Sequence, residues 1–497
     1  MQLTRSFFPI VLSVLLGAGA CTNSAAAEGE VSALQVAGAA TPVKLPFDVK
    51  AAIAAARPAF LELPISAEAA TCEPFVQSLA ARGIEHGVLA VPIVYGVAGG
   101  PTLRVHYYGQ WTGRAGTSPV TYFNGGPGSK VWNAAHKIQF LGAHLEELAA
   151  AGAPWVVFDQ RGNGCSTGFP TLFAANAAEA SLMYAYSSQQ IVQDAEALRL
   201  KLFGSKKWVV TGNSYGSLLV QQYTQLYPDS LKAAHAQGYG VLEDRKRFRE
   251  AFHRYSIELF ENVWKQHPEW ASKRAAMFQK YESDVRAKCT SRPNECALGL
   301  YPDNLVNAAQ LQQSPQLLAD FADAVSQNKQ PSSRPWETFP DSLRYDINPR
   351  TAGVLSVARI DYAPSDADPA DIYGCAAGQK AMFAKYTVSQ LAGLKVSGGA
   401  TQCYRIGAQE LQTMQWLGTL STGPSLLTLV ASIKAHPKLA FHLYQGLYDN
   451  LAPPTYVADM RQRLEGLPNF TFQNLNGNHG AFTLPEFFDA VLASMKN

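Results

Sequence analysis

Apolar runs separated by polar turns recur through the first half of the chain. Two long alternating runs, "GVLAVPIVYG" and "TLRVHYYGQW", predict the two strands of a hairpin. Shorter, wholly apolar runs predict strands that are buried on both faces. The predicted strands are 87–96, 102–111, 120–123, 155–162 and 207–212.

Helical periodicity separates these strands. In residues 187–204 the apolar positions Ile191, Ala195, Leu198 and Leu202 recur at helical spacing. Ser187 or Ser188 can cap the start of this helix, and Gly204 can cap its end. The same alternation continues with a helix at 217–228, strands at 439–446 and 470–475, and helices at 454–466 and 485–495. Strands alternating with helices predict an α/β fold, with a mostly parallel sheet covered by helices on both faces.

The pattern changes between residues 241 and 435. Long charged stretches with helical periodicity replace the short apolar runs, so this region is interpreted as a large, mainly helical cap inserted between two parts of one sheet domain. The predicted organisation is a signal peptide (1–27), an N-terminal extension (28–80), the first core part (81–240), the cap (241–435) and the second core part (436–497).

The N-terminus has the features of an export signal. Arg5 precedes an apolar stretch at 7–16 that is too short to span a bilayer. Cys21, which follows three small residues, resembles a bacterial lipoprotein cleavage site and would carry a lipid anchor; cleavage after Ala20 or Ala27 is the alternative. Either route predicts an exported protein, in the bacterial periplasm or cell envelope or secreted.

Composition narrows the classes of function. The chain has 497 residues, 47% of them hydrophobic and 16% charged, with a formal net charge of +2. These values are typical of a globular protein, and no run of five like charges suggests a nucleic-acid partner.

Six cysteines remain after Cys21. An even number in an exported chain favours disulfides, and nearness in sequence favours Cys289 with Cys296 and Cys375 with Cys403, which leaves Cys72 for Cys165. Buried free thiols are the alternative. No Cys-x-x-Cys pair with a histidine nearby in sequence suggests zinc, so we expect neither a metal nor a cofactor.

The candidate chemistry begins at "VVTGNSYGSLLV". An apolar strand runs into Gly212-Asn213-Ser214-Tyr215-Gly216 and a helix follows, which is the context of a nucleophilic serine held on a sharp strand-to-helix turn. A serine needs a base, and the base needs an acid to orient it. His479 lies in the loop "NLNGNHGAF" after the last strand, and Asp449 lies just past the preceding strand. We therefore predict Ser214, Asp449 and His479 as a catalytic triad.

The glycine cluster in "TYFNGGPGSKVW" fits the same chemistry. Acyl transfer puts negative charge on a carbonyl oxygen, which preorganised backbone N–H groups stabilise. One donor is the N–H of Tyr215, directly after the nucleophile. Pro127 has no N–H, so Gly126 is the better second donor and Gly125 the next candidate.

The motifs "NGGPGS", "DQRGNGCST" (159–167) and "GNSYGS" together resemble the proline iminopeptidase and tripeptidyl aminopeptidase branch of the α/β-hydrolase fold. The resemblance covers about 70–240 and 436–497. It implies a serine peptidase that removes residues from the free N-terminus of a peptide substrate, with Asp159 and Arg161 bracing the loops around the site. Asn124 departs from this pattern, because proline iminopeptidases commonly have a histidine before GGPG.

An aminopeptidase must recognise an ammonium group, and a carboxylate from the cap would do so. The resemblance places an acidic residue shortly after the chain leaves the sheet, where Glu243 and Asp244 stand. Solvated charges at a helix start are the alternative for both residues. Two other functions stay open: an esterase or small-amide hydrolase on the same fold, and a catalytically silent binding protein.

Overall fold

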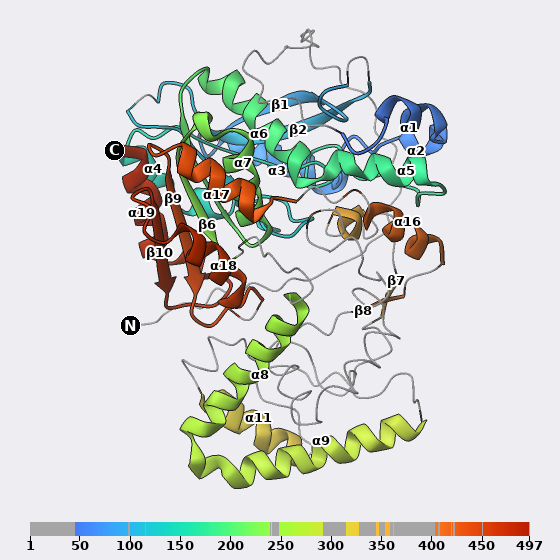
Figure 1. Ribbon diagram of the computed structural model, residues 1–497, viewed down its shortest axis with the longest axis vertical. Coiled ribbons are helices and arrows are strands. Elements are labelled where there is room, and N and C mark those ends of the chain that lie inside the picture. Colours follow the sequence, from blue (N-terminus) through green and yellow to red (C-terminus); the bar gives the residue numbers. More distant parts are fainter. Residues whose placement is uncertain are drawn as a thin grey trace. The chain divides into compact units, whose positions relative to one another are not determined.

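The computed structural model describes residues 45–97, 100–114, 116–238, 240, 248–291, 315–327, 344–346, 353–357, 361, 403–405, 408–418, 420, 423–449 and 451–496. It contains an eight-stranded sheet in the order β1-β2-β4-β3-β5-β6-β9-β10. Figure 1 labels β1, β2, β6, β9 and β10 of this sheet. The strands are β1 (Glu85–Pro92), β2 (Thr102–Gln110), β3 (Val120–Phe123), β4 (Trp155–Phe158), β5 (Trp208–Asn213), β6 (Leu231–Gln237), β9 (Ala440–Gly446) and β10 (Phe470–Leu475).

The pairing of the strands is mostly parallel. β1 pairs antiparallel with β2, and β2 pairs antiparallel with β4, whereas all later neighbours are parallel. The parallel strands need helical crossovers, which cover the sheet. The predicted hairpin and the predicted α/β fold with a mostly parallel sheet are therefore confirmed.

Side chains of the central strands point alternately into two hydrophobic cores, one on each face of the sheet. In β3, Tyr122 belongs to one core and Phe123 to the other; in β4, Val157 and Phe158 divide in the same way. Because both faces are buried, these strands read in the sequence as continuous apolar runs.

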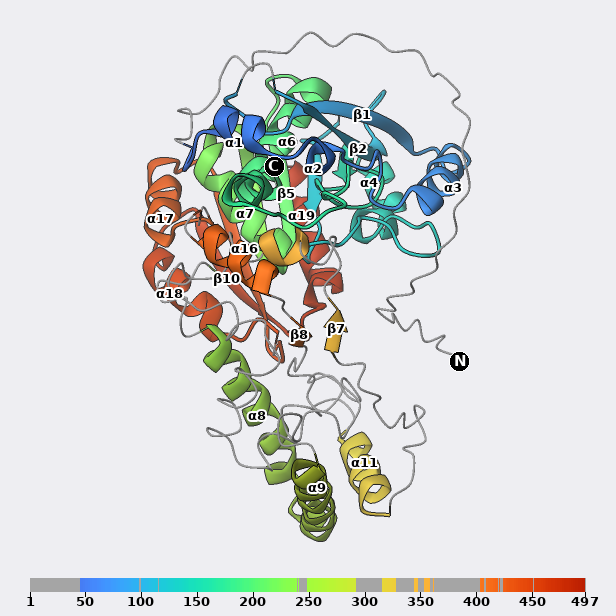
Figure 2. The same cartoon turned by 90° about the vertical axis from the view of Figure 1, so that its right-hand side faces the viewer.

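Helices from both ends of the chain cover these faces. One core receives buried residues from α1 (Val49–Ala55), α2 (Pro58–Leu61), α5 (Ala177–Leu182), α6 (Ser188–Phe203), α7 (Tyr215–Leu226), α17 (Leu426–Ala435) and α18 (Thr455–Leu464). The other receives them from α3 (Ala69–Ala80), α4 (Leu145–Ala150) and α19 (Pro485–Lys496). Figure 2 shows α17 and α18 on one side of the sheet and α3 on the other.

The inserted segment contributes α8 (Phe248–Gln266), α9 (Ala271–Ser291), α11 (Gln316–Ser326) and α16 (Ala408–Gly418). It also contains a short parallel pair that the sequence did not predict, β7 (Arg344–Asp346) with β8 (Cys403–Arg405). At its end α17 packs on α7, where the Ser432 hydroxyl donates to Thr224 O at 2.8 Å. The described residues also include five short 3₁₀ helices: η1 (Phe140–Ala143), η2 (Met183–Tyr186), η3 (Pro228–Ser230), η5 (Pro268–Trp270) and η7 (Ala481–Thr483).

A disulfide joins Cys72 on α3 to Cys165 in the loop after β4, across 93 positions of sequence. This is the pair predicted by elimination. The pairings of Cys289 with Cys296 and of Cys375 with Cys403 stay predictions, because Cys296 and Cys375 lie outside the described residues.

Candidate active site

Ser214 lies on a sharp turn between β5 and α7. Its φ of 54° and ψ of −126° place a non-glycine residue in a conformation that L-amino acids rarely adopt. A Cβ on Gly216 would lie 1.9 Å from Phe123 O, and a Cβ on Gly212 would lie 2.5 Å from Gly216 O. Both glycines are therefore required by close backbone approach, which is the packing that a GxSxG turn between strand and helix needs.

Asp449 and His479 meet at the carboxyl edge of the sheet. Asp449 follows the end of β9 and is fully buried, and His479 follows β10 with its side chain 22% exposed. His479 Nδ1 lies 3.0 Å from Asp449 Oδ1 and 2.9 Å from Oδ2, and Ala452 N donates to Oδ1 at 2.8 Å. The Nδ1 proton is thereby held on the carboxylate side, which leaves Nε2 as the acceptor nitrogen.

The charge of Asp449 sets the protonation of His479. Burial alone would lower the pKa of the imidazole, but the charge and the hydrogen bond of Asp449 outweigh it, so the pKa of His479 is raised above its ordinary value of 6.5. An aspartate that stabilises an imidazolium in this way suits a base that must accept a proton during the reaction.

Ser214 shares this edge of the sheet. Its N–H donates to Gln237 O at 3.0 Å, at the end of β6. A Cβ on the next residue, Gly238, would lie 3.3 Å from Asp449 Oδ2 and 3.8 Å from His479 Cε1. Among the described residues, no hydrogen bond joins Ser214 Oγ to His479; such contacts often tighten only when substrate binds.

The glycine loop after β3 lies against the serine. A Cβ on Gly125 would lie 3.3 Å from Ser214 Cβ, so Gly125 is directly beside Ser214. Gly126 follows with a φ of 120°, and a Cβ there would lie 2.7 Å from Gly128 N. Only glycine fits this backbone. The two candidate oxyanion donors of this loop are therefore the N–H of Gly125, which lies beside Ser214, and the N–H of Gly126, the next residue in the chain.

Asp159 holds the glycine loop in place. Its buried carboxylate accepts from Val131 N at 3.0 Å and from Trp132 Nε1 at 3.1 Å, both at the end of that loop. It also accepts from Tyr108 Oη at 2.8 Å and Cys165 N at 2.9 Å. Burial raises the pKa of Asp159, although these four donors oppose the shift. The bracing role that the family resemblance implies for Asp159 agrees with these contacts.

Arg161 fixes the neighbouring loop from inside the core. Its guanidinium makes a bidentate pair with Asp194 on α6, at 2.5 and 2.7 Å, and donates to the carbonyls of Pro92, Ile93 and Ala185. Both side chains of the pair are fully buried. Breaking one partner of such a pair leaves a buried charge uncompensated, so Arg161 is structural rather than available to a substrate.

Asn124, the departure from the iminopeptidase pattern, also has a structural role. Its side chain is buried and donates to Lys130 O across the glycine loop, while Gln160 Nε2 donates to Asn124 O at 3.0 Å. The amide therefore closes the loop by a bond within the loop itself.

Glu243 and Asp244 lie outside the described residues. Among described side chains, one group of possible metal ligands lies within 4.8 Å of one another: Cys72, Cys165 and His106. Sequence spacing did not predict that His106 lies near the two cysteines. The two sulfur atoms are bonded to each other, so they offer no thiolates to a metal. None of the helices in the described ranges combines the length and apolar character needed to cross a bilayer.

Comparison with known proteins identifies the fold. The sequence model of a family described as the alpha/beta hydrolase fold matches residues 118–484. The comparison with curated proteins gives no match. A thermophilic esterase from Thermogutta terrifontis is similar at 14% identity over 82% of this chain and 96% of that chain, with a TM-score of 0.35. A structure from a study of carboxylesterases of the thaumarchaeon Nitrososphaera gargenis is similar at 11% identity over 82% and 97%, with a TM-score of 0.36.

Proposed function

Because the chain belongs to the α/β-hydrolase fold family, we propose that it is a serine hydrolase in which Ser214, His479 and Asp449 form the catalytic triad. The observation that carries this proposal is the Asp449–His479 hydrogen bond beside a serine with a φ of 54°. The backbone of such a serine exposes its hydroxyl to substrate. Among the described residues, His479 makes hydrogen bonds through Nδ1 only, so Nε2 can accept the serine proton.

In the proposed reaction, His479 Nε2 takes the proton of Ser214 Oγ as the oxygen adds to the substrate carbonyl. The N–H groups of Gly126 and Tyr215 donate to the oxyanion of the tetrahedral intermediate. Protonated His479 then gives its proton to the leaving group, and the acyl group stays on Ser214. Water, deprotonated by His479, releases the acyl product and restores the serine.

We propose peptides with a free N-terminus as substrates, so that the enzyme is an aminopeptidase. The support is the combined resemblance of "NGGPGS" and "DQRGNGCST" to iminopeptidases and tripeptidyl aminopeptidases. An esterase is an equally good alternative, because the same triad and oxyanion donors would cleave an ester. Export to the periplasm or cell envelope, with or without a lipid at Cys21, is proposed from Arg5 and the apolar run that follows it.

The first experiment tests the nucleophile. A fluorophosphonate probe should label the full-length protein at Ser214, and Ser214→Ala should abolish labelling and nearly all turnover while leaving the circular dichroism spectrum unchanged. Retention of activity within tenfold of wild type in Ser214→Ala would reject the assignment. If the chain were instead a catalytically silent binding protein, the probe would label no residue.

The second experiment separates peptidase from esterase. Aminoacyl and tripeptidyl chromogenic amides are assayed with and without an acetyl cap, beside simple acyl esters. The aminopeptidase cuts the free amides and rejects the capped ones. Efficient cleavage of capped peptides, or of esters alone, would favour the esterase.

A further inference from the structure

Asp361 reaches the catalytic half of the molecule from the inserted segment. Its side chain is fully buried. One carboxylate oxygen accepts from the Ser188 hydroxyl at 2.8 Å, and the other accepts from Ser188 N at 3.0 Å and from the Tyr215 hydroxyl at 2.8 Å. A buried carboxylate is stable only when such donors replace water, so these contacts fix the position of Asp361.

The first group of donors belongs to the start of α6. Ser187 occupies the cap position, but its side chain makes no capping bond, and its buried hydroxyl oxygen has no hydrogen-bond partner in the part of the chain that the structure describes. The first N–H groups of a helix have no partner within the helix, and a negative charge there is favourable. Asp361 supplies both the acceptor and the charge from 173 positions away in the sequence.

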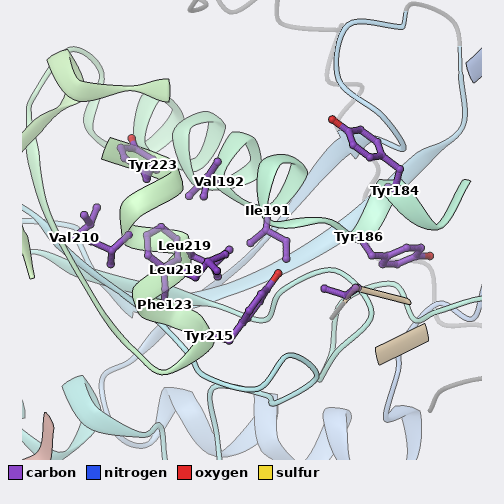
Figure 3. Close-up of a cluster of buried hydrophobic side chains, with 14 of the residues drawn as sticks. Phe123, Tyr184, Tyr186, Ile191, Val192, Val210, Tyr215, Leu218, Leu219 and Tyr223 are labelled. Atoms are coloured by element: carbon purple, nitrogen blue, oxygen red, sulfur yellow. The ribbon is translucent and has the colours of Figure 1, made fainter. Parts of the chain in front are cut away.

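The second donor belongs to the nucleophile turn. Tyr215 directly follows Ser214 and is the first residue of α7. Its ring is buried in the cluster drawn in Figure 3, with Ile191 and Leu218 as fellow members. Asp361 fixes the hydroxyl, and the core fixes the two faces of the ring. Because the ring is rigid, these contacts also restrict the backbone of Tyr215. The N–H of this residue is the oxyanion donor in the proposed reaction.

The same stretch of the inserted segment touches the opposite loop. A Cβ on Gly128 would lie 2.7 Å from Val354 Cγ2, so Val354 packs directly on the glycine loop. Val354 and Asp361 therefore contact both loops that would supply oxyanion donors, Val354 through Gly128 and Asp361 through Tyr215.

We propose that Asp361 is a positioning residue that holds the Tyr215 N–H in the oxyanion hole, so that the inserted segment helps to build the catalytic site. The inference rests on the proposed serine hydrolase function. A misplacement of about 1 Å in a catalytic group can reduce a rate up to a hundredfold. Because the oxyanion forms only as the substrate reacts, loss of the Asp361–Tyr215 bond should affect the transition state more than substrate binding.

The experiment compares four variants of the full-length protein. Tyr215→Phe and Asp361→Asn remove or weaken the bond itself. Tyr223→Phe is the matched control, because the Tyr223 hydroxyl donates to the buried Glu196 from the same helix, α7. Ser188→Ala removes another bond to Asp361 without touching Tyr215. For each variant, kcat, KM, the thermal midpoint and the inhibition constant of a substrate-like boronic acid are measured.

Tyr215→Phe and Asp361→Asn should lower kcat about tenfold, leave KM within twofold, and weaken the boronic acid by a similar factor, because its adduct with Ser214 imitates the tetrahedral intermediate. Tyr223→Phe should lower the thermal midpoint and leave kcat within twofold. Ser188→Ala removes one of the bonds that fix Asp361, so it should lower kcat, but by less than Asp361→Asn does. If Asp361→Asn does not fold, Tyr215→Phe decides.

Equal kcat values for Tyr215→Phe and Tyr223→Phe would overturn the inference while leaving the proposed function intact, provided that the fluorophosphonate probe labels Ser214 in all variants. A wild-type protein that the probe does not label would overturn the proposed function, and the inference with it.

Discussion

At the scale of single residues, the candidate site depends on positions where the backbone leaves no room for a Cβ atom. Gly216 cannot carry a Cβ because Phe123 O occupies that space, and Gly126 has a backbone angle that other residues avoid. These requirements are visible in the sequence, since a glycine pattern beside a strand end predicts close backbone approach. The histidine and aspartate of the proposed triad could be predicted for a similar reason: each follows a strand of a parallel sheet, and such strand ends share one edge.

The raised pKa of His479 gives a residue-scale prediction. Asp449→Asn removes the charge that raises this pKa, while burial continues to lower it. The acid limb of the pH profile of kcat/KM, which reports the free base, should therefore move to lower pH. The variant should also lose activity by a factor on the order of 10⁴, because the imidazolium formed in the reaction loses its partner.

The measurement is kcat/KM between pH 4 and 9 on the best substrate of the panel. Asp459→Asn, on α18, is the control for loss of one carboxylate near the C-terminus. An acid limb that stays in place in Asp449→Asn would contradict the assignment of Asp449 as the partner of the base.

At the scale of elements, the strands with continuous apolar runs were predicted correctly, and β3 agrees residue for residue. β6 was missed. Its sequence, "LKAAHAQ", is rich in alanine and contains His235, whereas strands are recognised by β-branched and aromatic residues. The run at 155–162 was predicted too long, because the chain leaves the strand at Asp159 to form the bracing loop. The predicted cap of α6 by Ser187 or Ser188 was incomplete, because Asp361 caps it from a distant segment.

The missed strand β6 contributes one of two stacked histidines, and this pair has a consequence for stability. His235 on β6 stacks on His442 of β9, with ring centroids 4.4 Å apart. The buried ring of His235 is hydrogen-bonded to Tyr444 Oη and Ser494 Oγ, each at 3.0 Å. Burial lowers the pKa of His442 to about 4, and burial together with the charge of His442 lowers the pKa of His235 well below its ordinary value.

Both rings are therefore neutral in the folded protein at pH values where the unfolded chain binds protons. Stability is complete above the unfolded pKa of about 6.5 and falls as pH drops toward the folded pKa. His442→Gln removes one of these groups. Its free energy of unfolding should fall less between pH 7 and pH 4.5 than that of wild type, by on the order of 2 kcal/mol.

Urea unfolding at the two pH values measures this difference, and each protein at pH 7 is its own reference. Equal losses of stability on acidification in the variant and the wild type would show that His442 does not control acid stability.

At the scale of the whole molecule, the chain leaves the sheet after β6 and returns to it with α17 and β9. The inserted segment between them contacts the candidate site and its loops. Val354 packs on Gly128, and the Tyr255 hydroxyl on α8 donates to Leu447 O, two residues before Asp449. Burial, with nearby acidic groups, raises the pKa of Tyr255 to about 12, so it remains a donor at neutral pH. Such contacts join positions far apart in sequence and leave no periodic signal, so the sequence predicted an inserted cap but not which of its residues reach the site.

The last prediction concerns how the inserted segment would select a free N-terminus. Glu243 and Asp244 precede α8, at the point where the chain leaves the sheet. A carboxylate facing the acyl side of the site would pair with the substrate ammonium, and a desolvated pair of this kind contributes a few kcal/mol. Glu243→Gln keeps the shape and removes the charge. KM for free-amine substrates should rise about tenfold or more, which corresponds to about 1.4 kcal/mol, with kcat within twofold.

The matched control is Glu258→Gln, which removes an exposed carboxylate from α8 itself. A simple ester, which has no ammonium group, should show the same KM with both variants and with wild type. A rise in KM for the ester as well would mean that Glu243 supports the fold of the segment rather than the ammonium. No rise with either substrate would transfer the role to Asp244, where Asp244→Asn must then give the same selective loss. If neither variant separates amine from ester, the inserted segment does not read charge at the N-terminus, and the esterase becomes the better description of the enzyme.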